Sequence, residues 1–307
     1  SQRAESITFK HLEPELAQSP ARLTGTFGFG PGLVAAVRGK AAVPRWLGPL
    51  PAFERIDKLQ DEWRHGDLLL QVAAEDPTSV AHAVHLLVRD SRAFATVRWS
   101  QVGFRHGFGV KPPGATMRNL FGQVDGTVNP VAGTADFDQV VWRDASSDPD
   151  WLVGGTTMVV RRIAMNLDTW EKADRTAREF AIGRRLSDGA PLTGGVEHTE
   201  PDLAALNEQG MTVIGPAAHL RRARTDDPTQ RILRRGYNYD LGPGQPDHVG
   251  LIFTTFQADL LHQFLPLQQR LAEQDLMNEW TTPIGSAVFA IPAGIRPGQV
   301  VGQALFD

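Results

Sequence analysis

One carboxylate in this sequence has a setting in which acid–base chemistry is possible. Asp125 lies in Arg118-Asn-Leu-Phe-Gly-Gln-Val-Asp-Gly-Thr-Val-Asn-Pro130, next to glycine and close to an apolar Leu-Phe pair. A carboxylate placed beside a reacting group can take up and release protons. Asp-Gly pairs also suit tight turns, because both residues tolerate positive φ angles. The motif alone is compatible with a catalytic aspartate and with a plain turn residue.

A histidine further along the chain is a candidate metal ligand. His219 lies in Gly215-Pro-Ala-Ala-His-Leu-Arg-Arg-Ala-Arg224, where two alanines leave space around its ring. Imidazole is the usual axial ligand of haem iron in oxygen and peroxide chemistry. The alternative is a half-buried histidine with one ring nitrogen bonded to the backbone. The segment Arg231-Ile-Leu-Arg-Arg-Gly-Tyr-Asn-Tyr239 follows and offers fixed positive charges.

Composition removes several classes of protein. The chain has no cysteine, which excludes disulfides, thiolate metal sites, iron–sulfur clusters and cysteine nucleophiles. The net charge is −4 and lysines form no block, so we expect no nucleic-acid partner, although Arg221, Arg222 and Arg224 form a local basic cluster. No apolar run reaches the roughly 18 residues of a membrane-spanning helix. We therefore expect a globular protein without a membrane span.

Hydrophobic periodicity predicts alternating strands and helices. A length of 307 residues indicates two domains or one large α+β unit built from two related halves. Period-2 or continuous apolar runs predict strands at 22–28, 68–74, 95–102, 157–166, 250–256 and 287–292. Helical spacing of apolar residues predicts helices at 78–92, 169–184 and 257–276.

A faint internal repeat indicates how these elements are grouped. Residues 68–88 and 250–271 both run from an apolar strand through a short polar break into an amphipathic helix. This pattern favours two ferredoxin-like halves, which we place at 1–150 and 151–307. The first half carries Asp125 and the second carries His219. The long irregular segments 115–149 and 183–239 have lengths typical of functional loops, and most candidate residues fall in them or at their edges.

Three ordered motifs resemble those of the dye-decolourising peroxidases. They are Asp125 in Gly-Gln-Val-Asp-Gly, His219 in Ala-Ala-His-Leu-Arg and Arg234 in Arg-Ile-Leu-Arg-Arg-Gly, at separations typical of that family. The similarity extends from Phe27-Gly-Phe-Gly-Pro-Gly-Leu33 through Ile182-Gly-Arg-Arg and 188–191 to 282–292, and so covers nearly the whole chain.

The resemblance implies a fold, a cofactor and an activity. The fold would be α+β, with two ferredoxin-like halves of the dimeric α+β barrel type, antiparallel sheets and peripheral helices. Haem b would lie between the sheet and the loops of the C-terminal half. The activity would be that of a haem peroxidase, which reduces hydrogen peroxide and oxidises organic donors such as dyes or phenols through an oxoferryl intermediate. A protein reductant is an open alternative to an organic one.

The same resemblance assigns the central residues. His219 would bind iron through Nε2 and donate its Nδ1–H to an acceptor, for which Glu279 is our candidate. Asp125 would move protons on the opposite, distal face of the haem. Arg234, preferred to Arg235 because it directly follows Ile-Leu, would stabilise negative charge on the bound peroxide.

Further residues are expected around this centre. Leu251 and Phe253 alternate on one strand and are expected to form a dry distal wall, which is compatible with ordinary strand core. Arg184 or Arg221 is expected to pair with the haem propionates. Tyr237 and Tyr239, the only tyrosines, are candidates for electron transfer to the surface, although most such residues are packing groups.

The sequence also favours one subgroup of the family. Gly236 stands where another subgroup carries asparagine, and the Arg-Arg-Gly version resembles the exported bacterial A-type members. The first residue is Ser1 rather than Met, which agrees with removal of a leader. We therefore expect an extracytoplasmic or secreted protein, with a cytoplasmic location left open.

Two other functions are alternatives to the peroxidase. A haem-carrying or iron-handling protein with little turnover would use the same histidine and fold. A non-haem metal or hydrolase site built on Asp125 and His219 lacks support, because the sequence has neither a His-x-x-x-His pair nor a Gly-x-Ser-x-Gly elbow.

Overall fold

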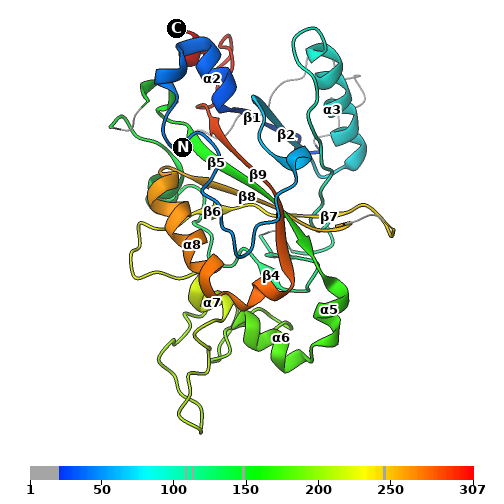
Figure 1. Ribbon diagram of the computed structural model, residues 1–307, viewed down its shortest axis with the longest axis vertical. Helices are drawn as coiled ribbons and strands as arrows, with labels where there is room; N and C mark the ends of the chain where they lie inside the picture. The colour runs from blue at the N-terminus through cyan, green and yellow to red at the C-terminus, as the bar shows by residue number, and fades with distance from the viewer. Residues whose placement is uncertain (1–20, 108, 113, 147–148, 245–246) are drawn as a thin grey trace.

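A curved antiparallel sheet forms the centre of the molecule (Figure 1). The computed structural model describes residues 21–107, 109–112, 114–146, 149–244 and 247–307. Within these residues the sheet has the strand order β2-β1-β9-β5-β8-β6, and β7 also pairs with β8. Its strands are β1 (Thr24–Phe29), β2 (Leu68–Ala73), β5 (Thr156–Met165), β6 (Leu233–Arg234), β7 (Tyr237–Asp240), β8 (Val249–Gln257) and β9 (Thr281–Ile291). A separate short hairpin joins β3 (Met117–Arg118) to β4 (Val124–Asp125).

The central strand β5 is buried on both faces, in keeping with its run of β-branched and apolar residues. Successive side chains of a strand point to opposite faces. Val159 accordingly packs on one face, in a cluster with Phe264 of the segment after β8. Met158 and Val160 pack on the other face, in a cluster with Phe289 of β9. The sheet therefore lies between two apolar layers.

Helices and loops surround the sheet. Within the described residues the α-helices are α2 (Pro31–Arg38), α3 (Pro77–Ser91), α4 (Ala135–Val141), α5 (Leu167–Lys172), α6 (Arg175–Ile182), α7 (His219–Arg222), α8 (Leu265–Gln274) and α9 (Gln303–Phe306). Shorter turns are η1 (Lys40–Ala42), η2 (Asp61–Trp63), η3 (Asp150–Leu152), the π-helix η4 (Leu260–Phe264) and η5 (Leu276–Glu279). In Figure 1, α5, α6 and α7 lie toward the lower end of the sheet, together with the long loop between α6 and α7.

The predicted fold class is confirmed, because the chain is a mixed α+β structure with an antiparallel sheet and peripheral helices. The predicted strands at 22–28, 68–74, 157–166 and 250–256 correspond to β1, β2, β5 and β8, and the helix predicted at 78–92 corresponds to α3. One sheet takes strands from both sides of residue 150. The division of the chain into two halves near that residue stays a prediction.

The strand predicted at 95–102 is wrong. This segment is irregular and lies along the surface, with the Val97 and Val102 side chains exposed. Side-chain hydrogen bonds, and not the backbone hydrogen bonds of a sheet, attach it to the protein. Arg98 Nε donates to the Arg64 carbonyl, and Trp99 Nε1 donates to the His65 carbonyl. The alternation of apolar residues in 95–102 therefore does not mark a strand, because single side chains such as Trp99 attach the segment to the rest of the protein.

A capping aspartate divides one predicted helix, and another marks the later start of a second. The helix predicted at 169–184 is split into α5 and α6, because Asp174 accepts a hydrogen bond from the Ala177 amide and starts a new helix. The helix predicted at 257–276 begins later, since β8 continues to Gln257 and Asp259 caps the π-helix η4. The two aspartates thus mark helix starts within stretches of continuous helical periodicity.

The last strand is longer than predicted. The sequence indicated 287–292, whereas β9 begins at Thr281 and crosses the sheet between β1 and β5. Pro283 and Gly285 concealed its first half, since both residues are unusual in strand interiors. A register shift opposite Arg162 and Ile163 accommodates this part of the strand, and the Trp63 backbone and Cβ approach Gly285 too closely for a side chain.

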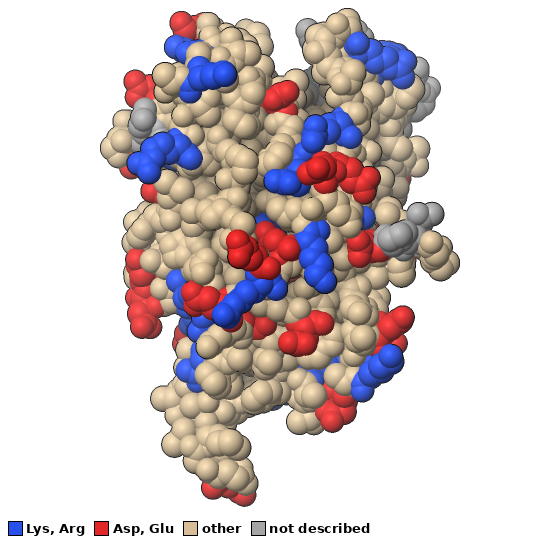
Figure 2. Space-filling view, in the orientation of Figure 1, with Lys and Arg blue, Asp and Glu red and all other residues tan. Residues whose placement is uncertain are grey.

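The surface charge on one face of the molecule is mixed (Figure 2), and the described helices are not of the membrane-spanning kind. On the face drawn in Figure 2, acidic and basic side chains are interspersed and neither sign covers an extended area. Among the described helices, none combines the length and apolar character that a membrane crossing requires.

A buried ion pair attaches the segment before η2 to the sheet. Arg161 on β5 pairs with Asp57, and their side chains are 1% and 8% exposed. Removing one member of a buried pair leaves an uncompensated charge, so Asp57→Ala is expected to lower the free energy of unfolding by about 3–5 kcal/mol. Urea denaturation measures this change.

The matched control is Asp61→Ala, since Asp61 also pairs with an arginine, Arg64, but its side chain is 93% exposed. Exposed pairs contribute about 0–1 kcal/mol. Equal effects of the two substitutions would contradict the structural role of the Asp57–Arg161 pair.

Candidate functional site

The predicted metal ligand His219 is held by a buried carboxylate. His219 is the first residue of α7, and its Nδ1 lies 2.5 Å from Oδ2 of Asp275. An ionised carboxylate only accepts hydrogen bonds, so Nδ1 carries the proton and donates it. The Asp275 side chain is 4% exposed, whereas that of His219 is 34% exposed. Nε2 makes no hydrogen bond within the described chain and is available as a ligand.

Local structure fixes the position of Asp275. The residue precedes η5, and its Oδ1 accepts a hydrogen bond from the Met277 amide while Oδ2 accepts from His219. Next to it, the Leu276 amide donates to the carbonyl of Ala217, two residues before the histidine. The two segments are therefore joined through their backbones as well as through the imidazole and carboxylate.

The electrostatic environment of His219 includes the other predicted catalytic residues. Burial lowers the pKa of His219, but the charge and hydrogen bond of Asp275 outweigh it, so that the pKa is raised. Arg234 lowers the same pKa and Asp125 raises it by smaller amounts. The structure thus brings the three residues close enough for their charges to interact.

Asp125 and Arg234 form a direct pair. Asp125 ends the short strand β4, and Arg234 ends β6 at the edge of the main sheet. Arg234 Nη1 lies 3.4 Å from Asp125 Oδ1, with side chains 25% and 19% exposed. The other oxygen of Asp125 lies 3.4 Å from Nδ2 of Asn119. These contacts are long, which leaves both groups able to bind a small polar molecule between them.

An asparagine fixes the backbone of Arg234 relative to the Asp125 loop. Asn129 Oδ1 accepts a hydrogen bond of 2.9 Å from the Arg234 amide, and Asn129 Nδ2 donates one of 2.8 Å to the Arg234 carbonyl. One side-chain amide therefore satisfies both backbone groups of the arginine. Since Asn129 lies four residues after Asp125, this clamp sets the separation of the two charged side chains.

A second asparagine shapes the hairpin that carries Asp125. Asn119 Oδ1 accepts from the amides of Phe121 and Gln123, and its Nδ2 donates to Gln123 Oε1. Met117 pairs with Asp125 across the hairpin. Asn119 is buried, and it positions the turn on which the aspartate stands.

The predicted wall residues lie on one face of β8. Leu251 is buried in the cluster that contains Met117, Phe121 and Met277, and Phe253 packs against the same cluster. Their position agrees with the expected apolar wall beside the site and also with strand core. The role of these residues stays a prediction.

Arg184, one of the two arginines predicted to bind propionates, is buried and only partly bonded. Arg184 is 9% exposed, and only its Nη1 is bonded, to the carbonyls of Gly189 and Glu197. Its Nε and Nη2 have no partner within the described chain. Burial lowers the pKa of Arg184, and Arg224 and Arg234 lower it further.

Arg221 is instead occupied by backbone. Its Nε donates to the carbonyl of Ile214, and its Nη2 donates to the carbonyls of Leu203 and Ile214. These bonds attach the loop before α7 to the helix. Two of its three nitrogens are thus used in holding the loop.

The structure places Asp275, and not Glu279, at Nδ1 of His219, which corrects the predicted acceptor. Glu279 lies at the far end of η5, where its side chain is exposed. The sequence offered two carboxylates four residues apart, and the turn at η5 decides between them. A capping signal was present, because an aspartate directly before a helical turn is a preferred N-cap.

The two tyrosines of β7 face away from the predicted wall. Tyr237 pairs with Ile252 and Tyr239 with Gly250, so both lie on the sheet face opposite to Leu251 and Phe253. Tyr239 is fully buried, and burial raises its pKa to about 12. An electron-transfer role for either tyrosine stays a prediction.

Comparison with known proteins identifies relatives over nearly the whole chain. The family model "Dyp-type peroxidase, N-terminal" matches residues 3–105, and "Dyp-type peroxidase, C-terminal" matches residues 116–296. The "Dye-decolorizing peroxidase" of Thermobifida fusca is 42% identical over 94% of this chain and 68% of that protein. The "Deferrochelatase" of Escherichia coli K12 is 33% identical over 94% of this chain and 69% of that protein.

Solved structures of similar proteins have the same fold as this chain. A DyP-type peroxidase from Cellulomonas bogoriensis superimposes with a TM-score of 0.90 at 52% identity, covering 96% of this chain and 81% of that one. Ferric DtpA from Streptomyces lividans also has a TM-score of 0.90, at 39% identity, covering 97% of this chain and 82% of that one.

The asparagine clamp yields a testable prediction. Asn129→Ala removes both part-buried hydrogen bonds to Arg234, and a hydrogen bond typically contributes about 0.5–1.5 kcal/mol to the free energy of unfolding, which is therefore expected to fall. Loss of the clamp should also let Arg234 move relative to Asp125, so the KM for peroxide is expected to rise more than kcat falls. Urea denaturation and steady-state kinetics measure the two effects.

The control is Asn166→Ala. Asn166 caps α5 by accepting a hydrogen bond from the Thr169 amide, and its side chain makes no hydrogen bond to Arg234 within the described chain. Loss of a helix cap costs about 1 kcal/mol. An equal rise in the peroxide KM of both variants would show that stability alone, and not the clamp, accounts for the effect.

Proposed function

This chain belongs to the Dyp-type peroxidase family, and we propose that it acts as a haem-dependent peroxidase through His219, Asp125 and Arg234. In the overall reaction one hydrogen peroxide and two donor molecules with an oxidisable O–H group give two waters and two donor radicals. The observation that carries the proposal is the free Nε2 of a carboxylate-bound histidine whose charge environment includes the Asp125–Arg234 pair.

The residues present fit haem b, since His219 offers an iron ligand and Arg184 a partner for a propionate. Nε2 of His219 offers one neutral nitrogen, and the absence of cysteine leaves imidazole as the natural axial ligand. The buried and partly unbonded guanidinium of Arg184 can pair with a propionate, since arginine matches carboxylates bidentately. Two structures of DtpA, at 38% and 39% identity, are described as oxyferrous and ferric forms, which supports iron chemistry in this family.

Bound haem would supply the redox-active iron at which the O–O bond of peroxide is cleaved. The protein residues supply the remaining requirements. Asp275 holds the His219 ring in the tautomer with Nδ1–H and makes the imidazole more electron-donating. This favours higher oxidation states at whatever metal the Nε2 atom binds.

Asp125 would handle the protons of the peroxide. Cleavage requires removal of a proton from one peroxide oxygen and delivery of a proton to the other, and a single carboxylate can do both. Its long contacts with Arg234 and Asn119 leave lone pairs of Asp125 available for this exchange. Arg234 cannot act as a base, because guanidinium is not deprotonated in proteins.

Arg234 would instead stabilise negative charge. A fixed positive group aimed at the point where charge develops lowers the energy of the transition state. The Asn129 clamp restricts the backbone of Arg234 and so reduces the reorganisation needed during the reaction. Leu251 and Phe253 would keep water from this side of the site and so strengthen the electrostatic effect.

A haem-carrying protein with little turnover is the alternative. Relatives named "Deferrochelatase" are 33% identical to this chain. A haem carrier needs the histidine and a partner for the propionates. It does not need a carboxylate and an arginine paired close to the histidine. The Asp125–Arg234 pair therefore favours the peroxidase.

We also propose an extracytoplasmic or secreted location, from the resemblance of the Arg-Arg-Gly sequence at 234–236 to the exported A-type subgroup. The reductant would be an organic molecule or a protein. Cell fractionation tests the location, and recovery only in the cytoplasm would contradict it.

Replacement of the proposed acid–base residue tests the function. Asp125→Asn keeps the size of the side chain and removes its proton exchange, so kcat/KM for peroxide is expected to fall by about 10²–10⁴-fold. Stopped-flow reaction of the haem-loaded protein with peroxide measures this, and the absorption spectrum before mixing verifies that haem is bound.

The control is Asp136→Asn, since Asp136 is also an aspartate paired with an arginine, Arg231, and is half exposed. It should keep the wild-type rate. A haem-loaded Asp125→Asn protein that reacts at the wild-type rate would refute the proposed role of Asp125, whereas a haem-loaded wild-type protein that does not react with peroxide would favour the carrier.

A further inference from the structure

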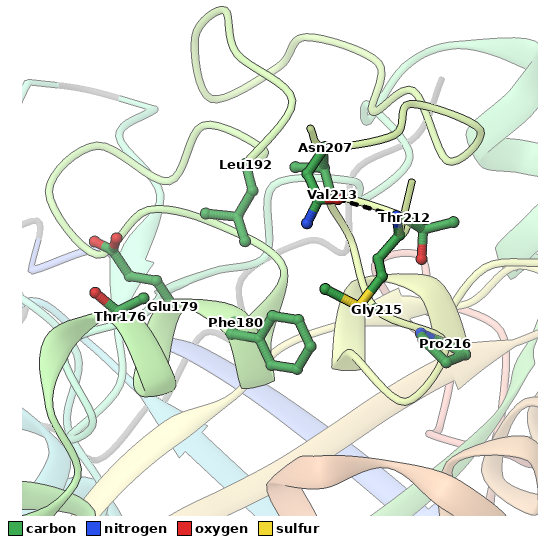
Figure 3. A pocket seen from close by; sticks show the side chains of 10 residues that line it. Thr176, Glu179, Phe180, Leu192, Asn207, Thr212, Val213, Gly215 and Pro216 are labelled. Atoms are coloured by element: carbon green, nitrogen blue, oxygen red, sulfur yellow. Dashed lines mark hydrogen bonds between the residues drawn. The ribbon is translucent and has the colours of Figure 1, made fainter. Parts of the chain in front are cut away.

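A cavity of about 640 Å³ opens between α6 and the loop that leads to α7 (Figure 3). It is separate from the Asp125–Arg234 pair, because neither residue is among the ten described residues that line it. Its volume lies within the range of roughly 300–1,000 Å³ that is typical of small-molecule sites. None of the roles assigned above uses it.

The walls of the cavity suit an aromatic molecule. Phe180 lines it from α6, and Met211 lines it from the loop between α6 and α7. Both side chains are large and apolar, yet they are 45% and 61% exposed. Phe180 projects from α6 toward Gly215 and Pro216 in Figure 3. Aromatic rings stack on or meet the edge of other rings, and thioethers make favourable contacts with them. Leu192 and Val213 add further apolar surface.

Hydrogen bonds hold the cavity in shape. Asn207 Oδ1 accepts from the Met211 amide, and Leu206 pairs with Thr212, so the outer loop is closed on itself. At the base, the Arg221 side chain binds the carbonyl of Ile214, next to Gly215. A site ordered before binding loses less conformational entropy when a ligand enters.

The polar groups of the cavity select the charge of its ligand. Glu179 is the only charged residue among the described lining residues. Its Oε1 accepts from Arg175 and from the Leu186 amide, whereas Oε2 has no partner within the described chain. Asn207 Nδ2 likewise donates no hydrogen bond there. The free oxygen of Glu179 can accept a hydrogen bond from a ligand hydroxyl group, and the hydroxyls of Thr176 and Thr212 add further polar contacts. The Glu179 carboxylate disfavours an anion.

The base of the cavity belongs to the segment that presents His219. Gly215 and Pro216 line it, and the Ala218 amide, directly before His219, donates to the Gly215 carbonyl. The Phe180 ring lies against Gly215 so closely that a side chain there would meet it at 2.7 Å. A molecule in the cavity therefore lies against the loop that carries the proposed iron ligand.

We propose that this cavity is a binding site for a neutral aromatic alcohol that serves as an electron donor. The proposal rests on the proposed peroxidase function. Each donor would lose one electron and one proton from its O–H group, and two donors supply the two electrons and two protons that convert one peroxide into two waters. Sulfonated analogues would bind more weakly, because the unpaired Oε2 of Glu179 lies in the wall of the cavity.

Calorimetry of the haem-loaded protein without peroxide tests binding independently of turnover. The probes are 1-naphthol and 1-naphthol-4-sulfonate, which differ by one anionic group. We expect 1-naphthol to bind with a stoichiometry of one per chain and the sulfonate to bind at least tenfold more weakly. Phe180→Ala and Met211→Lys should each weaken 1-naphthol binding about tenfold, which corresponds to about 1.4 kcal/mol.

The matched control is Val196→Lys, because Val196 is 69% exposed on the same loop between α6 and α7 but does not line the cavity. It should keep wild-type binding. Met211 is largely exposed, so Met211→Lys tests the site even if Phe180→Ala disturbs the packing against Gly215. Binding unchanged in both cavity variants would overturn the proposed site.

Steady-state kinetics then test the role as donor site. Met211→Lys should raise the KM for 1-naphthol and leave the KM for peroxide unchanged. If the cavity variants lose binding while the KM for 1-naphthol stays the same, the cavity is not the donor site and the proposal fails. If no variant or wild-type protein turns over peroxide, the proposed function fails instead, and calorimetry still reports whether the cavity binds the aromatic probe.

Discussion

The hydrogen bond between His219 and Asp275 is the constraint on which the proposed chemistry depends. A buried carboxylate assigns the proton to Nδ1 and leaves Nε2 free, at a ring that remains one-third exposed. The same carboxylate caps η5 through the Met277 amide, so its position is set by local backbone structure. Metal ligands are commonly oriented in this way by an outer partner that fixes tautomer and basicity. This contact is the hydrogen bond that orients the His219 ring within the described chain.

The opposite side of the site is assembled by asparagine side chains that bond to backbone. Asn129 binds both backbone groups of Arg234, and Asn119 shapes the hairpin that carries Asp125. The charged groups themselves make only long contacts with each other. This arrangement places rigidity in the neutral amides and leaves the charged side chains available for a substrate, as expected where preorganised groups stabilise a transition state.

Much of this could be predicted from the sequence, and the limits have physical causes. The motifs around Asp125, His219 and Arg234 were sufficient to indicate the family, and apolar periodicity located the long strands β5 and β8. Capping explains two of the differences: a predicted helix contains a new start at Asp174, and the turn η5 brings Asp275 rather than Glu279 to the histidine. Such outcomes depend on turn geometry that periodicity does not report.

The most direct test of the account is the reduction potential of the haem-loaded protein in wild-type and Asp275→Asn forms. A carboxylate at Nδ1 makes the imidazole more electron-donating and stabilises ferric iron, so Asp275→Asn should raise the potential, whereas Glu279→Gln should not change it. Spectroelectrochemical titration measures both. An unchanged potential in Asp275→Asn, or an equal shift in Glu279→Gln, would contradict the central role of the His219–Asp275 hydrogen bond.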